Sequence, residues 1–268
     1  MHKTVGFIGC GNMGRAILAG ILDAGWVSPA KVMVSTSRAD TQEEIRNQFS
    51  TEVTMDNREV ARHSDILFLA VKPYLYEQVL KEIREEIKDD TIIIGMAAGM
   101  TLTKMEDFLG KPFKLVKIMP NTPVAVKEGL IAMSFSPYLD EVEKENVIAM
   151  ISTIGKVSLI EERHMDVITG ISGSSPAYVF MFIEAMADAA VKNGLPRKEA
   201  YEISAQAVLG AAKMVLETGI HPGTLKDMVT SPGGTTIEAV SVLEEKGLRH
   251  AVISAVDACI SKSRDMSR

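Results

Sequence analysis

The fold is decided by a stretch near the amino terminus, residues 4–20, which reads TVGFIGCGNMGRAILAG. The apolar run Thr4–Ile8 predicts a buried strand, and the apolar spacing over 13–24 predicts a helix directly after it. Between them stands a G-x-G-x-x-G motif, and this position is typical of a dinucleotide-binding βαβ unit. We therefore expect a nucleotide cofactor at this turn; the alternative is a glycine-rich turn that binds nothing.

Each glycine of the motif has a separate physical role. Gly9 allows the tight turn, Gly11 lets a pyrophosphate approach the main chain, and Gly14 lets the helix pack closely against the strand. The unpaired N–H groups at the start of the helix favour an anion. The cofactor-binding residues predicted in this turn are Gly9, Cys10, Gly11, Asn12, Met13 and Gly14.

Strand and helix patterns alternate in the first part of the chain, and only helical patterns follow. Apolar runs predict strands at 4–8, 31–35, 66–71, 91–95, 114–119, 130–135 and 156–160, and helical patterns lie between them at 13–24, 38–48, 74–87, 101–109 and 139–153. This predicts an α/β domain over residues 1–160, a Rossmann-type doubly wound parallel sheet. Residues 161–268 are predicted to form an all-helical domain, with helices at 176–193, 197–218, 222–230, 236–246 and 249–263.

The predicted helix 176–193 is apolar over much more than one face. A helix that is apolar nearly all round is buried nearly all round, and a region of roughly a hundred residues encloses few such helices. We therefore expect these helices to pack against a second copy of the chain, as a homodimer; the alternative is burial against the first domain alone.

The end of the second strand indicates which nucleotide binds. An NAD site usually carries Asp or Glu there to hold the ribose 2′-hydroxyl. Here the sequence is Ser35-Thr-Ser37-Arg38, and its hydroxyls and guanidinium suit a 2′-phosphate. NADPH is therefore the predicted cofactor, with NADH as an alternative. Ser37 could also simply cap the next helix.

Other loops follow the ends of predicted strands, where ligands of open α/β sheets bind. Ala70, Val71 and Lys72 follow one strand and are predicted to contact the cofactor, although a lysine such as Lys72 is more often a solvated surface residue. Ala98 and Asn121 lie in loops of small residues after the next two strands, where a nicotinamide ring would find room.

A glycine pair, Gly233-Gly234, precedes the predicted helix 236–246. Main-chain N–H groups exposed at such a helix start form a ready pocket for a carboxylate, and Thr235 and Thr236 add hydroxyls. The alternative is an ordinary helix cap, since Thr235 and Glu238 have the spacing of a capping box.

Composition excludes several classes of function. The formal net charge is −6 and basic residues are scattered, which argues against a nucleic-acid surface. The two cysteines imply no disulfide framework, and no leader or membrane-spanning stretch is evident, so we expect a cytoplasmic protein that binds no membrane. The dispersed histidines give no metal-binding spacing, and no G-x-S-x-G elbow is present.

Taken together, five motifs resemble those of the pyrroline-5-carboxylate reductase family, from about residue 4 to 262. They are Gly9-Cys-Gly-Asn-Met-Gly14, Ala70-Val-Lys-Pro73, Met119-Pro-Asn-Thr-Pro123, Ser172-Gly-Ser-Ser-Pro-Ala-Tyr178 and Leu225-Lys-Asp-Met-Val-Thr-Ser-Pro-Gly-Gly-Thr-Thr236. The first is shared by many dehydrogenases, whereas the last is specific.

The resemblance implies NAD(P)H-dependent reduction of a cyclic imine, the last step of proline biosynthesis, by a dimer that can assemble into larger rings. It implies that the Thr236 hydroxyl faces the ring nitrogen of the substrate. The substrate-binding residues it implies are Gly233, Gly234 and Thr235, whose main chain would hold the carboxylate, together with Ser174, Ser231 and Asn121. Asn57 resembles the family position near the adenosine ribose.

Two other functions remain as alternatives. A related Rossmann-plus-helical reductase could act on another imine, or as a 3-hydroxyacid dehydrogenase, which would need a lysine near the nicotinamide; only Lys192 and Lys213 are near in sequence. A regulatory nucleotide-binding protein would not need the motif at 225–236. An imine needs orientation and a hydrogen bond at nitrogen, not a strong base, which agrees with loops that carry hydroxyls and no catalytic histidine.

Overall fold

The computed structural model describes residues 3–267, which form two compact units. The sheet unit holds the residues up to Ser174 together with those from Cys259 onward, and the helical unit is Ser175–Ala258. The boundary predicted at residues 160 and 161 marks where strands give way to helices, and β8 ends at Leu159. The two compact units divide later in the chain, between Ser174 and Ser175, and the predicted domain assignment stays a prediction.

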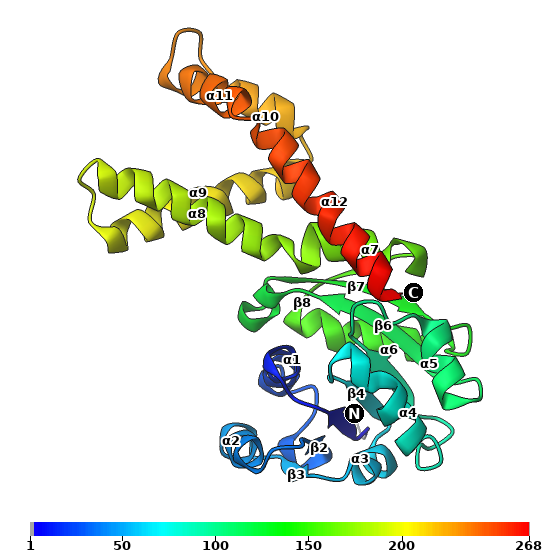
Figure 1. The fold of residues 1–268 in the computed structure, drawn as a ribbon. Coiled ribbons are helices and arrows are strands. Elements are labelled where there is room, and N and C mark those ends of the chain that lie inside the picture. Colours follow the sequence, from blue (N-terminus) through cyan, green and yellow to red (C-terminus); the bar gives the residue numbers. More distant parts are fainter. Residues whose placement is uncertain (1–2, 268) are drawn as a thin grey trace. The chain divides into compact units, whose positions relative to one another are not determined.

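The sheet unit is built on eight strands in the order β3-β2-β1-β4-β5-β6-β7-β8. Their bounds are β1 Val5–Ile8, β2 Val32–Ser35, β3 Glu52–Thr54, β4 Ile66–Leu69, β5 Ile92–Gly95, β6 Lys114–Pro120, β7 Gly129–Phe135 and β8 Gly155–Leu159 (Figure 1). The doubly wound Rossmann-type sheet is confirmed, and β3 is an additional strand that the sequence patterns did not predict.

One pairing departs from the predicted parallel arrangement. β7 runs antiparallel to β6, with Lys117 opposite Ser134, and β8 is parallel to β7. The connection from β6 to β7 contains only a short 3-10 turn, Thr122–Val126. A parallel return needs a crossover of a dozen or more residues, so this short connection dictates a hairpin-like reversal.

Helices cover both faces of the sheet (Figure 1). They are α1 Asn12–Asp23, α2 Ala39–Phe49, α3 Asn57–His63, α4 Tyr76–Ile83, α5 Leu102–Leu109, α6 Glu141–Ile151 and α7 Met165–Ile168, with a π turn over Thr169–Gly173. Short side chains fix several starts: Thr101 accepts a hydrogen bond from the Lys104 N–H, and Asp140 forms a capping box with Glu143.

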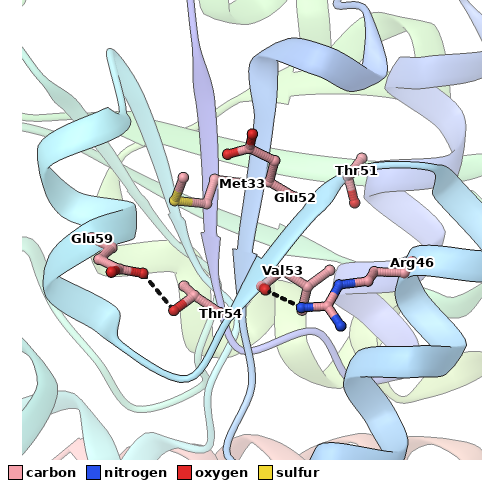
Figure 2. Close-up of a pocket in the computed structure, with 7 residues that line it drawn as sticks. All are labelled: Met33, Arg46, Thr51, Glu52, Val53, Thr54 and Glu59. Atoms are coloured by element: carbon pink, nitrogen blue, oxygen red, sulfur yellow. Dashed lines mark hydrogen bonds between the residues drawn. The ribbon is translucent and has the colours of Figure 1, made fainter.

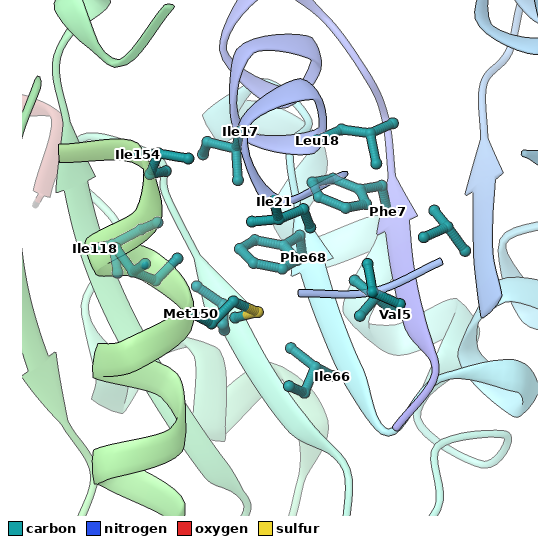
Figure 3. Close-up of a cluster of buried hydrophobic side chains, with 14 of the residues drawn as sticks. Val5, Phe7, Ile17, Leu18, Ile21, Ile66, Phe68, Ile118, Met150 and Ile154 are labelled. Atoms are coloured by element: carbon teal, nitrogen blue, oxygen red, sulfur yellow. The ribbon is translucent and has the colours of Figure 1, made fainter. Parts of the chain in front are cut away.

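The sheet separates two apolar cores. On one face, Phe7 and Phe68 stack at 4.5 Å beneath α1 and α6, as Figure 3 shows. The next residue, Ile8, points to the other face, where α3, α4 and α5 pack. Because both faces of β1 and β4 are buried, the carboxyl ends of these two strands are held rigidly, and the loops that follow them start from fixed positions.

The edge strand β3 borders a shallow cavity of about 340 Å³ (Figure 2). Arg46 donates a hydrogen bond from Nη2 to the Val53 carbonyl oxygen at 2.7 Å, and the Thr54 hydroxyl donates to Glu59 at 2.6 Å. Arg46 therefore satisfies a carbonyl of the outer strand, which protects this edge from pairing with another chain. None of the residues that line this cavity is among the predicted site residues.

The helical unit contains α8 Ser175–Lys192, α9 Arg197–Thr218, α10 Pro222–Met228, α11 Thr235–Glu245 and the first part of α12 Leu248–Ser267. In α8 only Ala187 is buried, and Phe180 and Met181 are 61% and 69% exposed in the single chain. The predicted all-round apolar helix is thus present, with much of its apolar surface uncovered. None of the helices within residues 3–267 combines the length and apolar character that a membrane span requires.

Candidate functional site

The glycine turn and the loop after β4 lie side by side at the carboxyl end of the sheet. The Ala70 N–H donates to the Ile8 carbonyl oxygen at 2.9 Å, and the Gly9 N–H donates to the Ser35 carbonyl oxygen at 3.0 Å. Gly9 has φ +79°, a conformation that favours glycine. β1 lies between β2 and β4, which is the switch point where open α/β sheets bind their ligands.

The other two glycines of the motif have the surroundings that their predicted roles require. A Cβ on Gly14 would stand 3.1 Å from the Ala70 Cβ, so this position keeps α1 close to the sheet. Nothing lies within 4 Å of a Cβ on Gly11, which leaves its main chain open to a ligand. No side chain caps α1, and its first turn carries no acidic residue. The turn therefore fits the pyrophosphate of a dinucleotide.

The three remaining members of this turn differ in exposure: Asn12 is exposed, Met13 half-buried and Cys10 buried. Burial raises the pKa of the Cys10 thiol to about 12, and the positive charge of Arg15 lowers it only in part. The thiol is therefore neutral at physiological pH and unreactive. Cys10 contributes to the turn through packing and through its main chain.

The end of β2 separates a buried hydroxyl from an exposed cation. Ser35 is 1% exposed and donates its hydroxyl to Asn57 Oδ1 at 2.7 Å, while Asn57 Nδ2 donates to Glu82 at 3.0 Å. Ser37 and Arg38 are exposed. The structure thus places Ser35 and Asn57 together as one hydrogen-bonded pair, with Ser37 and Arg38 as the solvent-exposed polar groups at this end.

The loops after β4 and β5 have different accessibility. Lys72 is exposed, whereas Val71 and Ala98 are half-buried. Gly99, with φ +73°, closely faces the main chain of Met266 in the last turn of α12. Met266 therefore packs against the loop that carries Ala98.

Two predicted substrate residues lie in the sheet unit and are already hydrogen-bonded there. Asn121 is 9% exposed; its Oδ1 accepts from the Leu130 N–H at 2.9 Å and its Nδ2 donates to the Ser172 hydroxyl at 3.2 Å. The Ser174 hydroxyl accepts a hydrogen bond from the Cys259 thiol at 3.2 Å. Both residues fasten the segment that leads into α8.

The remaining predicted substrate residues form one loop of the helical unit. The Gly234 N–H donates to the Ser231 carbonyl oxygen at 3.1 Å, and Gly233 has φ +67°. The predicted capping box is wrong: α11 begins at Thr235, and its N-cap is Gly234, which provides no side chain to cap the helix. Its first N–H groups are consequently available to a carboxylate. The hydroxyl groups of Thr235 and Thr236 have no hydrogen-bond partner within residues 3–267.

Sequence patterns missed Tyr76 and Glu82, which contact the predicted cofactor end of the sheet unit. Tyr76 is buried beside the ends of β4 and β5, and Glu82 holds Asn57. Both lie in α4, and their helical spacing there resembles that of any helix that packs against a sheet. Among the described residues, no group of three or more His, Cys, Asp or Glu side chains is placed to hold a metal ion.

Comparison with known proteins finds a separate family match in each half of the chain. Residues 4–99 match the model of the family described as NADP oxidoreductase, coenzyme F420-dependent, and residues 162–266 match pyrroline-5-carboxylate reductase dimerisation. The pyrroline-5-carboxylate reductase of Escherichia coli K12 is 48% identical over 268 residues, all of both chains. The chain belongs to the pyrroline-5-carboxylate reductase family.

Other members of the pyrroline-5-carboxylate reductase family support the same assignment. The enzyme of Methanosarcina acetivorans is 40% identical over 267 residues, an alignment that spans all of this chain and 99% of that enzyme. The Plasmodium falciparum structure with NADP bound has a TM-score of 0.92 at 32% identity, covering 100% of this chain and 99% of that one. These findings confirm the predicted resemblance, the fold class, an oxidoreductase of a nicotinamide cofactor and a domain that mediates oligomerisation.

Proposed function

We propose that this chain reduces L-1-pyrroline-5-carboxylate to L-proline, with NADPH as the preferred hydride donor. The observation that carries the proposal is the loop Ser231–Thr236, where an uncapped helix start stands beside two unpartnered hydroxyls. A small anion with a polar ring atom matches both features. The glycine turn of the sheet unit supplies the second requirement, an open main chain for a pyrophosphate.

In the proposed reaction the C=N bond becomes a C–N bond. NADPH, when bound, would supply the hydride that the imine carbon accepts, and the imine nitrogen carries a proton that comes from water or from the protonated substrate. The main chain at Gly233, Gly234 and Thr235 holds the carboxylate, and Thr236 orients the nitrogen through its hydroxyl. No strong base is required, so orientation supplies most of the rate enhancement.

The choice of NADPH over NADH rests on Ser37 and Arg38, which are exposed at the end of β2. Ser35 and Asn57 would act behind them, since their side chains bond to each other. In this arrangement the cofactor also contacts residues of the glycine turn and of the loops after β4 and β5, namely Asn12, Met13, Ala70, Val71, Lys72 and Ala98. A 3-hydroxyacid dehydrogenase is not favoured, because Lys213 faces Glu217 at 3.5 Å and both side chains are about two-thirds exposed.

We further propose that two copies associate through the helical unit, and that dimers can assemble into a ring. The uncovered side chains of α8 and α9, including Phe180, Met181 and Ile203, are the surface that such a dimer would bury. The cytoplasm is the proposed compartment, since Cys10 and Cys259 are both free thiols.

The test is oxidation of NADPH by the purified protein, followed by absorbance, with pyrroline-5-carboxylate as substrate and then with NADH in place of NADPH. Proline should appear in equal amount to the NADPH consumed. Equal kcat/KM with both cofactors would contradict the preference, and absence of oxidation with intact NADPH binding would contradict the reaction.

A further inference from the structure

The hydroxyl of Tyr76 is fully buried and bonded to three main-chain groups at the carboxyl ends of β4 and β5. It donates to the Leu69 carbonyl oxygen at 2.7 Å and accepts from the N–H groups of Met96 at 3.0 Å and Ala97 at 3.2 Å. All of its hydrogen-bonding capacity is therefore used. The side chain is 0% exposed, and no water is needed to satisfy it.

This hydroxyl takes the place of one main-chain hydrogen bond, or rung, between β4 and β5. β4 and β5 pair in parallel from Ile66 with Ile92 to Leu69 with Gly95, and the Ile92 N–H donates to the Asp65 carbonyl oxygen. Repeating that spacing along the strands, the last rung would join the Met96 N–H to the Leu69 carbonyl oxygen. The Tyr76 hydroxyl instead stands between these two groups and bonds to both.

Because the Tyr76 oxygen lies between the Met96 N–H and the Leu69 carbonyl oxygen, the two strands are farther apart at their carboxyl ends than a direct hydrogen bond would hold them. The loop beginning at Ala70 follows one strand and the loop beginning at Met96 follows the other, and both carry residues of the proposed cofactor path. The ring of Tyr76 also packs near Gly95, where a Cβ would stand 3.5 Å from its Cε1. The width between the two loops is thus set by a side chain and not by the sheet itself.

We infer that Tyr76 is a positioning residue for the cofactor, whose hydroxyl wedges the ends of β4 and β5 apart and fixes the two loops that receive the nicotinamide half of the dinucleotide. This inference rests on the proposed function for the identity of the ligand. Burial raises the pKa of the phenol, although the two N–H donors lower it, so the hydroxyl stays protonated and the wedge persists over the physiological pH range.

The experiment compares Tyr76→Phe with Thr91→Val. Thr91 lies directly before β5, is 0% exposed and donates its hydroxyl to the Ser64 carbonyl oxygen at 2.8 Å, at the opposite end of the strand. Each variant removes one buried hydroxyl, so both should lower the melting temperature. Only Tyr76→Phe should weaken NADP⁺ binding, by about five- to tenfold, because three main-chain groups lose their partner beside the ligand. Binding is measured by calorimetry without any imine.

Equal NADP⁺ affinity in Tyr76→Phe and the wild-type protein would overturn the inference, as would an equal loss in both variants. If Tyr76→Phe does not fold, hydrogen exchange on the ligand-free wild-type protein decides: the amides of Met96 and Ala97 should already be protected, whereas protection acquired only with NADP⁺ would contradict a preformed wedge. A wild-type protein that binds NADP⁺ but does not reduce the imine would contradict the proposed reaction and leave this test intact.

Discussion

The guanidinium of Arg38 and the carboxylate of Asp40 form two hydrogen bonds, from Nη2 to Oδ2 at 2.6 Å and from Nε to Oδ1 at 3.3 Å. Arg38 is the cation proposed to receive the 2′-phosphate of NADPH, so the carboxylate occupies the fork that the phosphate would use. The hydrogen bond from Arg38 lowers the pKa of Asp40, as does the Thr41 N–H, and the acid is ionised at neutral pH. Phosphate binding must therefore displace a like charge.

Replacement of Asp40 by Asn should strengthen NADPH binding by about threefold at low salt and leave NADH binding unchanged, because only the 2′-phosphate competes with this carboxylate. Arg38→Ala should do the reverse and weaken NADPH by about tenfold. Dissociation constants for both cofactors at two salt concentrations provide the measurement. A parallel change for NADH would show that the pair acts on the loop and not on the phosphate.

Thr236→Ala should lower kcat by about ten- to a hundredfold, since the proposed hydrogen bond to nitrogen is lost while the carboxylate site remains. Thr236→Ser keeps a hydroxyl and should recover most of the activity, which separates the hydrogen bond from the packing of the methyl group. The readout is kcat and KM for the imine in both variants. Unchanged turnover in Thr236→Ala would remove this residue from the mechanism.

Much of the fold followed from local patterns that are strong in this sequence. Continuous apolar runs such as Ile66–Leu69 identify strands buried on both faces, and the glycine motif places the first turn. Sequence patterns did not predict β3, because it has only three residues. They did not predict α3 either, because Val60 and Ala61 are its only buried side chains. The reversal at β7 is visible in the sequence only as the short connection before it.

Sequence patterns point to candidate residues whose surroundings depend on main-chain geometry, but not to those whose position depends on a hydrogen bond to a residue distant in the chain. Gly9 has a positive φ and Gly14 leaves little room for a side chain beside Ala70, so their residue type alone indicates a role. Ser35 and Asn121 are ordinary polar residues whose hydrogen bonds go to Asn57 and Ser172, far away in the sequence. No local sequence pattern predicts such partners. The hydrogen bonds of Tyr76 to Leu69, Met96 and Ala97 are likewise not visible in the sequence.

Phe180→Glu should convert the assembly to a smaller species, because a charge would be placed within the apolar surface that the proposed dimer buries. A buried aromatic side chain contributes roughly 1.5–3 kcal/mol, and an unpaired buried carboxylate adds a larger penalty. Sedimentation velocity measures the change in mass. Lys198→Gln, on an 85% exposed side chain of α9, is the control and should leave the mass unchanged. Equal masses for Phe180→Glu and the wild-type protein would place the interface elsewhere.

Lys114 and Lys117 lie on the same strand, β6, and should respond to pH in opposite senses. Lys117 is 3% exposed, and burial lowers the pKa of its ammonium group more than the charges of Glu162 and Asp166 raise it. Its charged form is thus less favourable folded than unfolded, so stability should rise as pH increases from the folded pKa toward 10.5. The hydrogen bond to Glu143 raises the pKa of Lys114, with Asp90 in support; this stabilisation is complete below 10.5 and is lost as pH rises through the folded pKa.

Lys117→Met should therefore raise the melting temperature by a few degrees at pH 7, and the gain should shrink in alkaline buffer as the wild-type lysine loses its proton. Lys114→Met is the matched control, since it removes a lysine from the same strand but breaks contacts of 2.7 Å to Glu143 and 3.0 Å to Asp90; it should lower the melting temperature at pH 7, with a loss that also shrinks above the folded pKa. Thermal unfolding from pH 7 to 10.5 is the measurement: over this range the gain from Lys117→Met should shrink, whereas the loss from Lys114→Met should stay constant. A less stable Lys117→Met at pH 7 would mean that attraction from Glu162 and Asp166 outweighs the cost of burying the charge.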